Sequence, residues 1–234
     1  MGAFKAPLLI IMKIKIFVYL FFFTVIHISY AKIDKKTILY YQVDNSKIQR
    51  NENETPEQFV ERLKPKNSKI THKVIDTKWN SIPVIIAFYE QSYKLSIKQD
   101  PDQNVYKKII ATLFIEKSKN LYDKLIIDTF DTDGGTPKIE TTFFSNSDKD
   151  VSKEIIIIVS WEQSSQEVSG TVYSTFVYDN LSSSSQDNLL FLKDISNKLS
   201  GGCECRFSDG RNKKAKFKTA KDIKDELLKL GINN

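Results

Sequence analysis

The feature that most constrains the fold is a run of consecutive β-branched residues, Ile-Ile-Ile-Ile-Val at positions 155–159. Branching at Cβ restricts the side-chain rotamers and favours extended backbone. Successive side chains of a strand point to opposite faces, so a run that is apolar at every position has no face suited to water. The run therefore predicts a central strand that is covered on both sides.

Further runs rich in Ile, Val, Phe, Tyr and Thr alternate with breaks that carry Asp, Asn, Gly, Ser and Pro, which is the pattern of strands joined by turns. The segment at residues 171–178 alternates polar and apolar side chains, so we expect one of its sides to face solvent. Strands at this spacing predict a mostly antiparallel sheet or sandwich. The predicted strands are residues 38–43, 82–89, 107–115, 124–129, 138–144, 154–161 and 171–178.

A short helix is predicted before this β-rich region. Thr55 and Gln58 have the spacing of a capping box, and Pro56 stands at the first helical position, where its missing N–H costs nothing. The helix should run to about Leu63 and stop before Pro65.

Two more helices are predicted in the C-terminal section, residues 187–234, which we expect to pack on the sheet. Residues 187–199 carry Leu and Ile at helical spacing and are followed by a Gly pair. Thr219 should cap a last helix that ends at Gly231. The fold class is therefore α+β, and the apolar stripe of the last helix is formed by Ile223, Leu227 and Leu230.

The N-terminus has the pattern of a cleavable secretory signal. Lys13 and Lys15 precede the apolar residues 16–26, and Ser29 and Ala31 hold the two small-residue positions before a cleavage site. The alternative is a membrane anchor, but the apolar stretch is shorter than the roughly 20 residues that span a bilayer. We expect residues 1–31 to be removed and residues 32–234 to form one domain without stable membrane insertion, periplasmic or extracellular.

Loss of this segment removes three lysines and lowers the formal net charge from +6 to +3. A small positive charge on a chain of this size argues against a nucleic-acid-binding protein.

The residues available for catalysis are few. His72 is the one histidine beyond the signal, and no Gly-x-Ser-x-Gly motif occurs. One histidine with Cys203 and Cys205 is an incomplete set of zinc ligands. The sequence therefore predicts a protein that is not an enzyme, although acids that converge only in the fold are an open alternative.

Cys203 and Cys205 are separated by one residue. They either close a small ring in an oxidising compartment or remain two free thiols. A redox role would favour the Cys-x-x-Cys spacing, so we expect a structural or incidental role.

An acidic loop directly before the central strand is the candidate metal site. Asn146, Asp148, Asp150 and Glu154 occupy positions 1, 3, 5 and 9 of this loop. Alternate residues of a tight loop can direct oxygen atoms to one ion, and calcium prefers oxygen ligands. Calcium is thus the one cofactor considered; the alternative is a loop whose acids are simply solvated.

This loop resembles the Asp-x-Asp-x-Asp-Gly-x-x-Asp/Glu loop of FG-GAP-like (integrin-α-type) repeats, which exported bacterial proteins of unknown function often carry before a hydrophobic strand. The resemblance implies that Asn146, Asp148, Asp150 and Glu154 are the ligands. It covers about a dozen residues in a single loop; Val151 stands where the repeats have Gly, and Asn146 where they have an acid. A second acidic segment at residues 131–135 is predicted to be a hairpin turn.

Residues 206–221 are strongly basic, with Asp209 as the one acid among them. Such a segment attracts anionic partners, and the alternative is a solvated loop before a capped helix. The candidate partner-binding residues are Arg211, Lys213, Lys214, Lys216 and Lys218.

By elimination, the sequence favours an exported, non-enzymatic binding protein that neutralises a protein partner in the periplasm, as immunity proteins and enzyme inhibitors do. The alternatives are an envelope enzyme and a surface-binding adhesin.

Overall fold

The structure is a computed structural model that describes residues 44–234 except 149, 180–188 and 233–234. The chain divides into two units, Met1–Tyr40 and Tyr41–Asn234, and every described residue belongs to the second. The predicted signal at residues 1–31 and the predicted strand at residues 38–43 lie outside the described residues.

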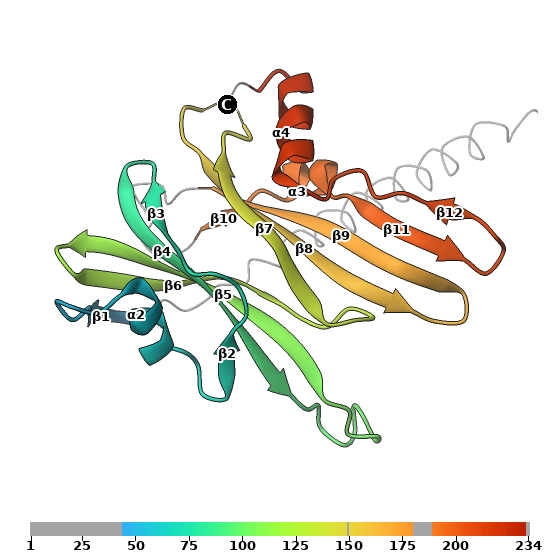
Figure 1. The fold of residues 1–234 in the computed structure, drawn as a ribbon, viewed down its shortest axis with the longest axis horizontal. Coiled ribbons are helices and arrows are strands. Elements are labelled where there is room, and N and C mark those ends of the chain that lie inside the picture. Colours follow the sequence, from blue (N-terminus) through green and yellow to red (C-terminus); the bar gives the residue numbers. More distant parts are fainter. Residues whose placement is uncertain (1–43, 149, 180–188, 233–234) are drawn as a thin grey trace, which may run out of the picture. The chain divides into compact units, whose positions relative to one another are not determined.

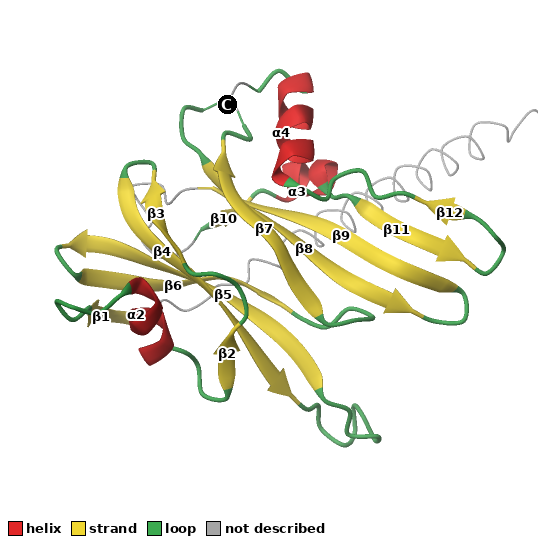
Figure 2. Ribbon diagram, in the orientation of Figure 1, coloured by secondary structure: helices red, strands yellow, loops and turns green. Residues whose placement is uncertain are grey.

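The first sheet is an antiparallel meander with short strands at its edges (Figures 1 and 2). Its strands lie in the order β1-β6-β5-β4, and β2 and β3 pair with different parts of β4. The bounds are β1 Asp44–Gln49, β2 Ser68–Ile70, β3 Ile75–Trp79, β4 Ile82–Tyr93, β5 Tyr106–Ser118 and β6 Leu121–Phe130.

The second sheet is built in the same manner around three long strands. Its order is β12-β11-β9-β8-β7, and β10 pairs with the end of β9 that β11 leaves uncovered. The bounds are β7 Pro137–Ser145, β8 Glu154–Ser164, β9 Val168–Asp179, β10 Leu190–Phe191, β11 Gly202–Phe207 and β12 Asn212–Lys213.

The two sheets pack face to face through alternate residues of their strands. Ile86 and Phe88 of β4 and Ile155 and Ile157 of β8 belong to one buried apolar core. The residues between them point the other way, as the twofold period of a strand requires. The core therefore lies between two sheets, as in a sandwich.

Helices cover the outer faces of both sheets. On the first sheet, Phe59 and Val60 of α2 (Pro56–Arg62) pack with Tyr89, whose hydroxyl donates to the Val60 carbonyl at 2.9 Å. On the second sheet, Ile156 and Ile158 pack with apolar residues of α3 (Lys193–Leu199) and α4 (Ala220–Lys229). The order of layers is helix, sheet, sheet, helices.

The prediction of a β-rich, mostly antiparallel core is confirmed, and so is the burial of residues 155–159 on both sides. The helix predicted from the Thr55 capping box is present with the expected cap and ends at Leu63. The part of β9 expected to face solvent is instead partly covered, because Val177 is buried and its N–H donates to the Ser196 hydroxyl of α3.

The helix predicted over residues 187–199 is wrong in its first part. Leu190 and Phe191 form β10, and α3 begins only at Lys193. Phe191 pairs with Tyr178, and their ring centroids lie 5.5 Å apart, so sheet pairing replaces a helical turn here. The N-cap of α3 is Leu192, whose side chain cannot accept a hydrogen bond from the first turn. The sequence therefore carries no capping signal at the point where the helix begins.

Two further details differ from the expectations. Leu230, placed on the buried stripe of the last helix, is 48% exposed. The segment at residues 131–135 does not close a hairpin, because β6 and β7, which it joins, belong to different sheets. It is the connection between the two layers.

Among the described residues, no helix is long and apolar enough to cross a membrane.

Candidate functional site

The candidate site is the loop between β7 and β8, which is built from a series of side-chain turns. The Asn146 amide oxygen accepts from the Asp148 N–H at 3.2 Å, the Asp148 carboxylate from the Asp150 N–H at 2.8 Å, and the Asp150 carboxylate from the Ser152 N–H at 2.7 Å. Each side chain thus caps the backbone two residues ahead, as Asp and Asn commonly do in turns. This repetition places the acids on alternate positions of one compact loop.

Glu154, the first residue of β8, is fully buried at the base of this loop. One carboxylate oxygen, Oε2, accepts from the Ser147 backbone N–H and from the Ser147 hydroxyl at 2.7 Å. The other oxygen, Oε1, is buried and has no hydrogen-bond partner among the residues that the structure describes. A buried carboxylate oxygen without a donor is unfavourable, so this atom needs either a proton or a cation.

The electrostatics of the site act in the same direction. The pKa of the Glu154 carboxyl is raised to about 7: burial is the main cause, the hydrogen bonds from Ser147 oppose it, and the negative charges of Asp148 and Asp179 add to it. A positive ion beside the carboxylate would offset both causes of this shift.

Three of the four predicted ligands come together. Carboxylate oxygens of Asp148, Asp150 and Glu154 all lie within 4.8 Å of one another. Calcium–oxygen distances are about 2.3–2.6 Å, so oxygens around one ion lie no more than about 5 Å apart. Asn146 has a different role, because its amide group spans the loop and donates to the Asp150 carbonyl.

Val151, which stands where FG-GAP-like repeats have glycine, does not strain this loop. Val151 is 99% exposed and is not among the residues with positive φ. The backbone therefore turns at this position without the left-handed conformation that would require glycine.

The end of the loop is attached to the other sheet. The Lys153 carbonyl accepts from the Trp79 indole N–H and from the Asn80 amide at 3.1 Å, and the Lys153 N–H donates to Asn80 at 2.9 Å. Asn80 and Ser81 have φ values of 46° and 72° and form the tight turn between β3 and β4. The roles of Ser147, Trp79 and Asn80 were not predicted from the sequence. The one local signal was the pair Asn80-Ser81 between two apolar runs, which is typical of a tight turn.

A pocket of about 360 Å³ borders the loop. Ser147 and Asp148 form one part of its lining, and the start of the α3 region forms the rest, with Leu190 and Phe191 prominent. These two apolar side chains are 59% and 42% exposed. The pocket is thus largely apolar, with Asp148 shared between it and the acidic cluster.

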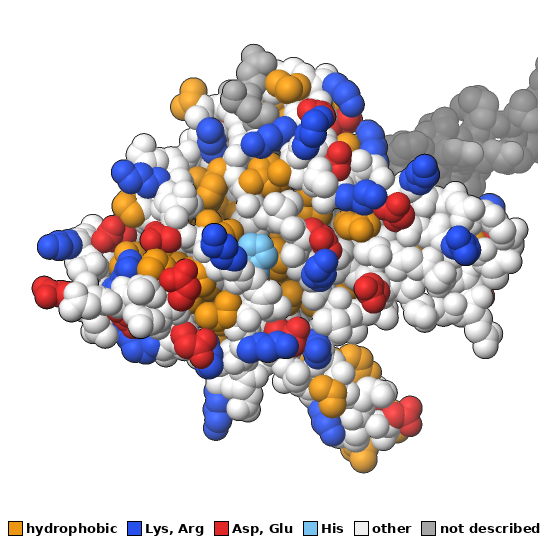
Figure 3. Space-filling view, viewed as in Figure 1, with side chains coloured by type: hydrophobic (Ala, Val, Ile, Leu, Met, Phe, Trp, Pro, Cys, Tyr) orange, Lys and Arg blue, Asp and Glu red, His pale blue; other side chains and the backbone are white. Residues whose placement is uncertain are grey.

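Much of the charge in the basic segment is paired with acids. Arg211 lies 2.6 Å from Asp209, Lys216 lies 3.0 Å from Glu226, and Lys218 forms an ion pair with Glu204. Figure 3 shows Lys and Arg side chains around the region of α4 with acidic side chains among them. Lys213 and Lys214 are exposed and have no ion-pair partner in the described part of the chain.

The other residues considered for catalysis lie apart. His72 is half-buried before β3, its ring is 5.3 Å from that of Phe88, and its Nδ1 is 2.8 Å from the Lys73 carbonyl. Cys203 and Cys205 are bonded to each other on β11, in the second sheet.

No protein-family model, curated protein or solved structure matches this chain.

Proposed function

We propose that this chain is a non-enzymatic binding protein whose β7–β8 loop takes up one calcium ion. The observation that carries the proposal is the buried carboxylate of Glu154: its Oε1 atom has no donor among the described residues, and one of its oxygens clusters with those of Asp148 and Asp150. A divalent cation at this cluster would satisfy that atom and neutralise the repulsion between the carboxylates.

Calcium fits this ligand set better than other common ions. The candidate ligands are oxygen atoms alone, whereas zinc favours nitrogen and sulfur. Magnesium requires a regular octahedron at about 2.0–2.1 Å and keeps most of its water, and calcium tolerates the irregular arrangements that loops provide.

The broader proposal is an exported protein that neutralises an anionic protein partner through its basic segment. Lys213 and Lys214 support it, because these exposed charges are free of ion pairs within the described chain. The paired residues Arg211, Lys216 and Lys218 would contribute less, since their charges are already partly balanced.

The composition of the pocket beside the loop favours binding over catalysis. Its two acids, Asp148 and Asp194, are accompanied by Lys193 and several large apolar side chains. Hydrolysis by paired carboxylates requires two acids facing a polar substrate, and a mainly apolar wall suits an apolar ligand surface better.

Thermal melts of the protein with and without calcium test the proposed site. An ion that binds only the folded state at a hundred times its Kd adds about 2.7 kcal/mol of stability, which corresponds to a rise in Tm of about 5–10 °C for a domain of this size. We expect this rise with calcium, a smaller one with magnesium, and its reversal by a chelator. Titration calorimetry should give a stoichiometry near one.

The double variant Asp148→Ala, Asp150→Ala should abolish the rise in Tm. Asp102→Ala is the matched control, because Asp102 is an exposed acid in a turn remote in sequence from the loop. If the parent shows neither a melting shift nor binding heat with millimolar calcium, the proposed calcium site is wrong.

A further inference from the structure

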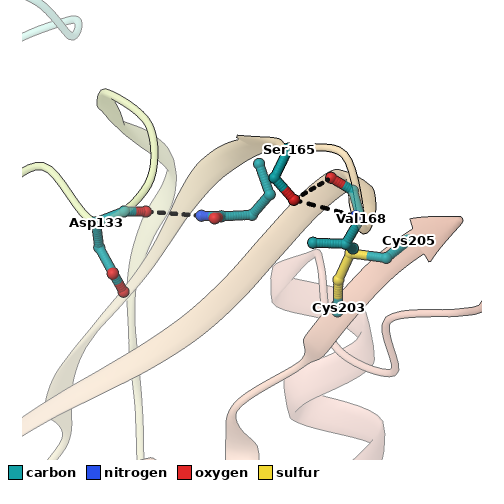
Figure 4. Close-up of a disulfide and its surroundings, with 6 residues drawn as sticks. Asp133, Ser165, Val168, Cys203 and Cys205 are labelled. Carbon is teal, nitrogen blue, oxygen red and sulfur yellow. Dashed lines mark hydrogen bonds between the residues drawn. A yellow bond between two sulfur atoms is a disulfide. The ribbon is translucent and has the colours of Figure 1, made fainter. Parts of the chain in front are cut away.

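We propose that the Cys203–Cys205 disulfide is a site of reversible thiol–disulfide exchange with an exogenous dithiol. This goes beyond the proposed calcium and partner binding, and it shares only Lys213 with the residues named for them. The bond joins two residues of a single strand, β11, with one residue between them. Figure 4 shows the two cysteine side chains meeting beside this strand.

The bond is not needed to hold β11 in the sheet. The pairing of β11 with β9 is continuous from Gly202 to Phe207, on both sides of the disulfide. A crosslink stabilises a protein mainly by closing a loop of the unfolded chain, and the effect falls with loop length. A loop of three residues gives the smallest gain, so retention of the fold after reduction is expected.

The backbone is arranged so that β9 and β11 approach closely at this point. Cys205 pairs with Gly170, where a Cβ atom would lie 2.7 Å from the Cys205 Cα and 2.2 Å from the Glu204 carbonyl oxygen. Gly170 also has a φ of 145°, which favours glycine. The strand that carries the disulfide is therefore positioned by backbone contact rather than by the sulfur bridge.

The disulfide does not belong to the apolar cluster between the two sheets. Cys203 and Cys205 pair with Val172 and Gly170 of β9. Both of these lie an even number of residues from the core residue Tyr178, so all three point to the same face of the strand. The cysteine side chains hence point to the inner side of the second sheet. No described residue of β11 or β12 belongs to the apolar core between the sheets, although Cys205 itself is buried.

The two sulfur atoms differ in access. Cys203 is half-buried and Cys205 is 5% exposed, so an incoming thiolate reaches Cys203 first. Attack on the Cys203 Sγ forms a mixed disulfide, breaks the Cys203–Cys205 bond and releases Cys205 as a thiolate. The second thiolate of the reagent then attacks the reagent's first sulfur, which is bonded to Cys203 in the mixed disulfide. This closes the reagent into a ring and releases Cys203 as a thiolate. Two electrons pass to the protein, the thiolates take up two protons, and the reagent leaves as a disulfide.

A lysine is placed to favour the first step. Lys213 is the direct partner of Cys205 in the ladder between β11 and β12, and direct partners project on the same face of a sheet with close Cβ atoms. A nearby ammonium group stabilises a thiolate and lowers the thiol pKa, and a thiol of lower pKa leaves faster. The charge of Lys213 thus favours release of Cys205 as a thiolate and acts against its burial, which alone disfavours a charged sulfur.

The test is reduction of the folded, oxidised protein by millimolar dithiothreitol, followed by maleimide labelling and intact mass. We expect both thiols to label in the absence of denaturant, while the near-ultraviolet circular dichroism stays that of the oxidised protein. Dilution into oxidised glutathione should restore the bond. Lys213→Gln should slow reduction about threefold, and Lys119→Gln, at an exposed lysine in the turn between β5 and β6, should leave the rate unchanged.

Three results would overturn the proposal. One is reduction only in the presence of denaturant, and another is loss of the tertiary signal when the bond is broken, since both would make the disulfide structural. The third is labelling of two free thiols in the isolated protein. The double variant Cys203→Ser, Cys205→Ser should melt close to the parent, which separates loss of the bond from loss of the fold.

Discussion

Glu154 is a fully buried acid with a carboxylate oxygen that lacks a hydrogen-bond donor among the described residues. It is also the first residue of β8, whose next five residues are all apolar. A hydrophobic side chain of similar size at this position would avoid the cost of burying a charge. Because one of its oxygens lies near those of Asp148 and Asp150, its burial supports the proposed role as a calcium ligand.

The metal-free protein should lose stability as Glu154 ionises. Its pKa of about 7 in the folded state lies above the ordinary value of 4.5. The folded protein therefore holds the Glu154 proton more tightly than the unfolded chain does, and this difference stabilises the fold. The stabilisation is complete below the pKa of the unfolded state and is lost as the pH rises through the pKa of the folded state. Between about pH 5 and pH 8 the loss should be about 2–3 kcal/mol.

Glu154→Gln should remove this part of the pH dependence, because an amide does not titrate. Denaturant unfolding of both proteins in a chelator at the two pH values measures it. Equal slopes of stability against pH in the parent and the variant would contradict the assignment.

The spacing of the acidic residues was sufficient to predict which carboxylates meet, because alternate positions of a tight loop converge. It was not sufficient to predict that Ser147 holds Glu154, since a serine in a polar loop is ordinary. Nor did it predict the Trp79 and Asn80 hydrogen bonds to Lys153, which join residues more than 70 positions apart and depend on the packing of two sheets.

At the scale of elements, α4 illustrates how much a local pattern can specify. Thr219 and Asp222 form the reciprocal hydrogen bonds of a capping box, and Gly231 follows the helix with a φ of 76°. Ile223 and Leu227 are fully buried against the second sheet. Leu230 is the C-cap rather than a residue of the last turn, which explains why it extends the predicted stripe without being buried.

Leu227→Ala should destabilise the protein by about 2–5 kcal/mol, from lost transfer free energy together with the cavity left behind. Leu230→Ala is the matched control, and as a half-exposed residue it should cost less than about 1 kcal/mol. Equilibrium unfolding in urea measures both. Similar midpoints for Leu227→Ala and the parent would show that α4 does not dock.

The errors at the element scale share one physical origin. Leu190 and Phe191 have helical spacing with the residues that follow, and only the free edge of β9 makes them a strand. β11 and β12 lie among charged and small residues that do not alternate clearly, and their strands exist because β9 offers a partner. Edge pairing is a tertiary effect, so a single segment carries little signal for it.

At the scale of the whole described unit, the sequence predicted the β-rich, mostly antiparallel core and the burial of β8 on both faces, but not the division of the strands between two sheets. That division depends on the connection between β6 and β7, which the Asp-Gly pattern made look like a hairpin. A turn motif gives local geometry alone. Here the Trp161 indole donates to the Asp131 carbonyl at 2.8 Å and holds this connection against the second sheet.

The layered arrangement makes a prediction that no single sheet would satisfy. Ile157 faces the core between the sheets, and its neighbour Ile158 faces α3 and α4, and both are fully buried. Ile157→Ala and Ile158→Ala should each lower the free energy of unfolding by about 2–5 kcal/mol, because each leaves a cavity in a different core.

Ile97→Ala is the control: this residue is 69% exposed, and its variant should stay within about 0.5 kcal/mol of the parent. If Ile158→Ala matched the exposed control while Ile157→Ala destabilised the protein, the outer face of the second sheet would be bare, and the order of helix, sheet, sheet and helices would be wrong.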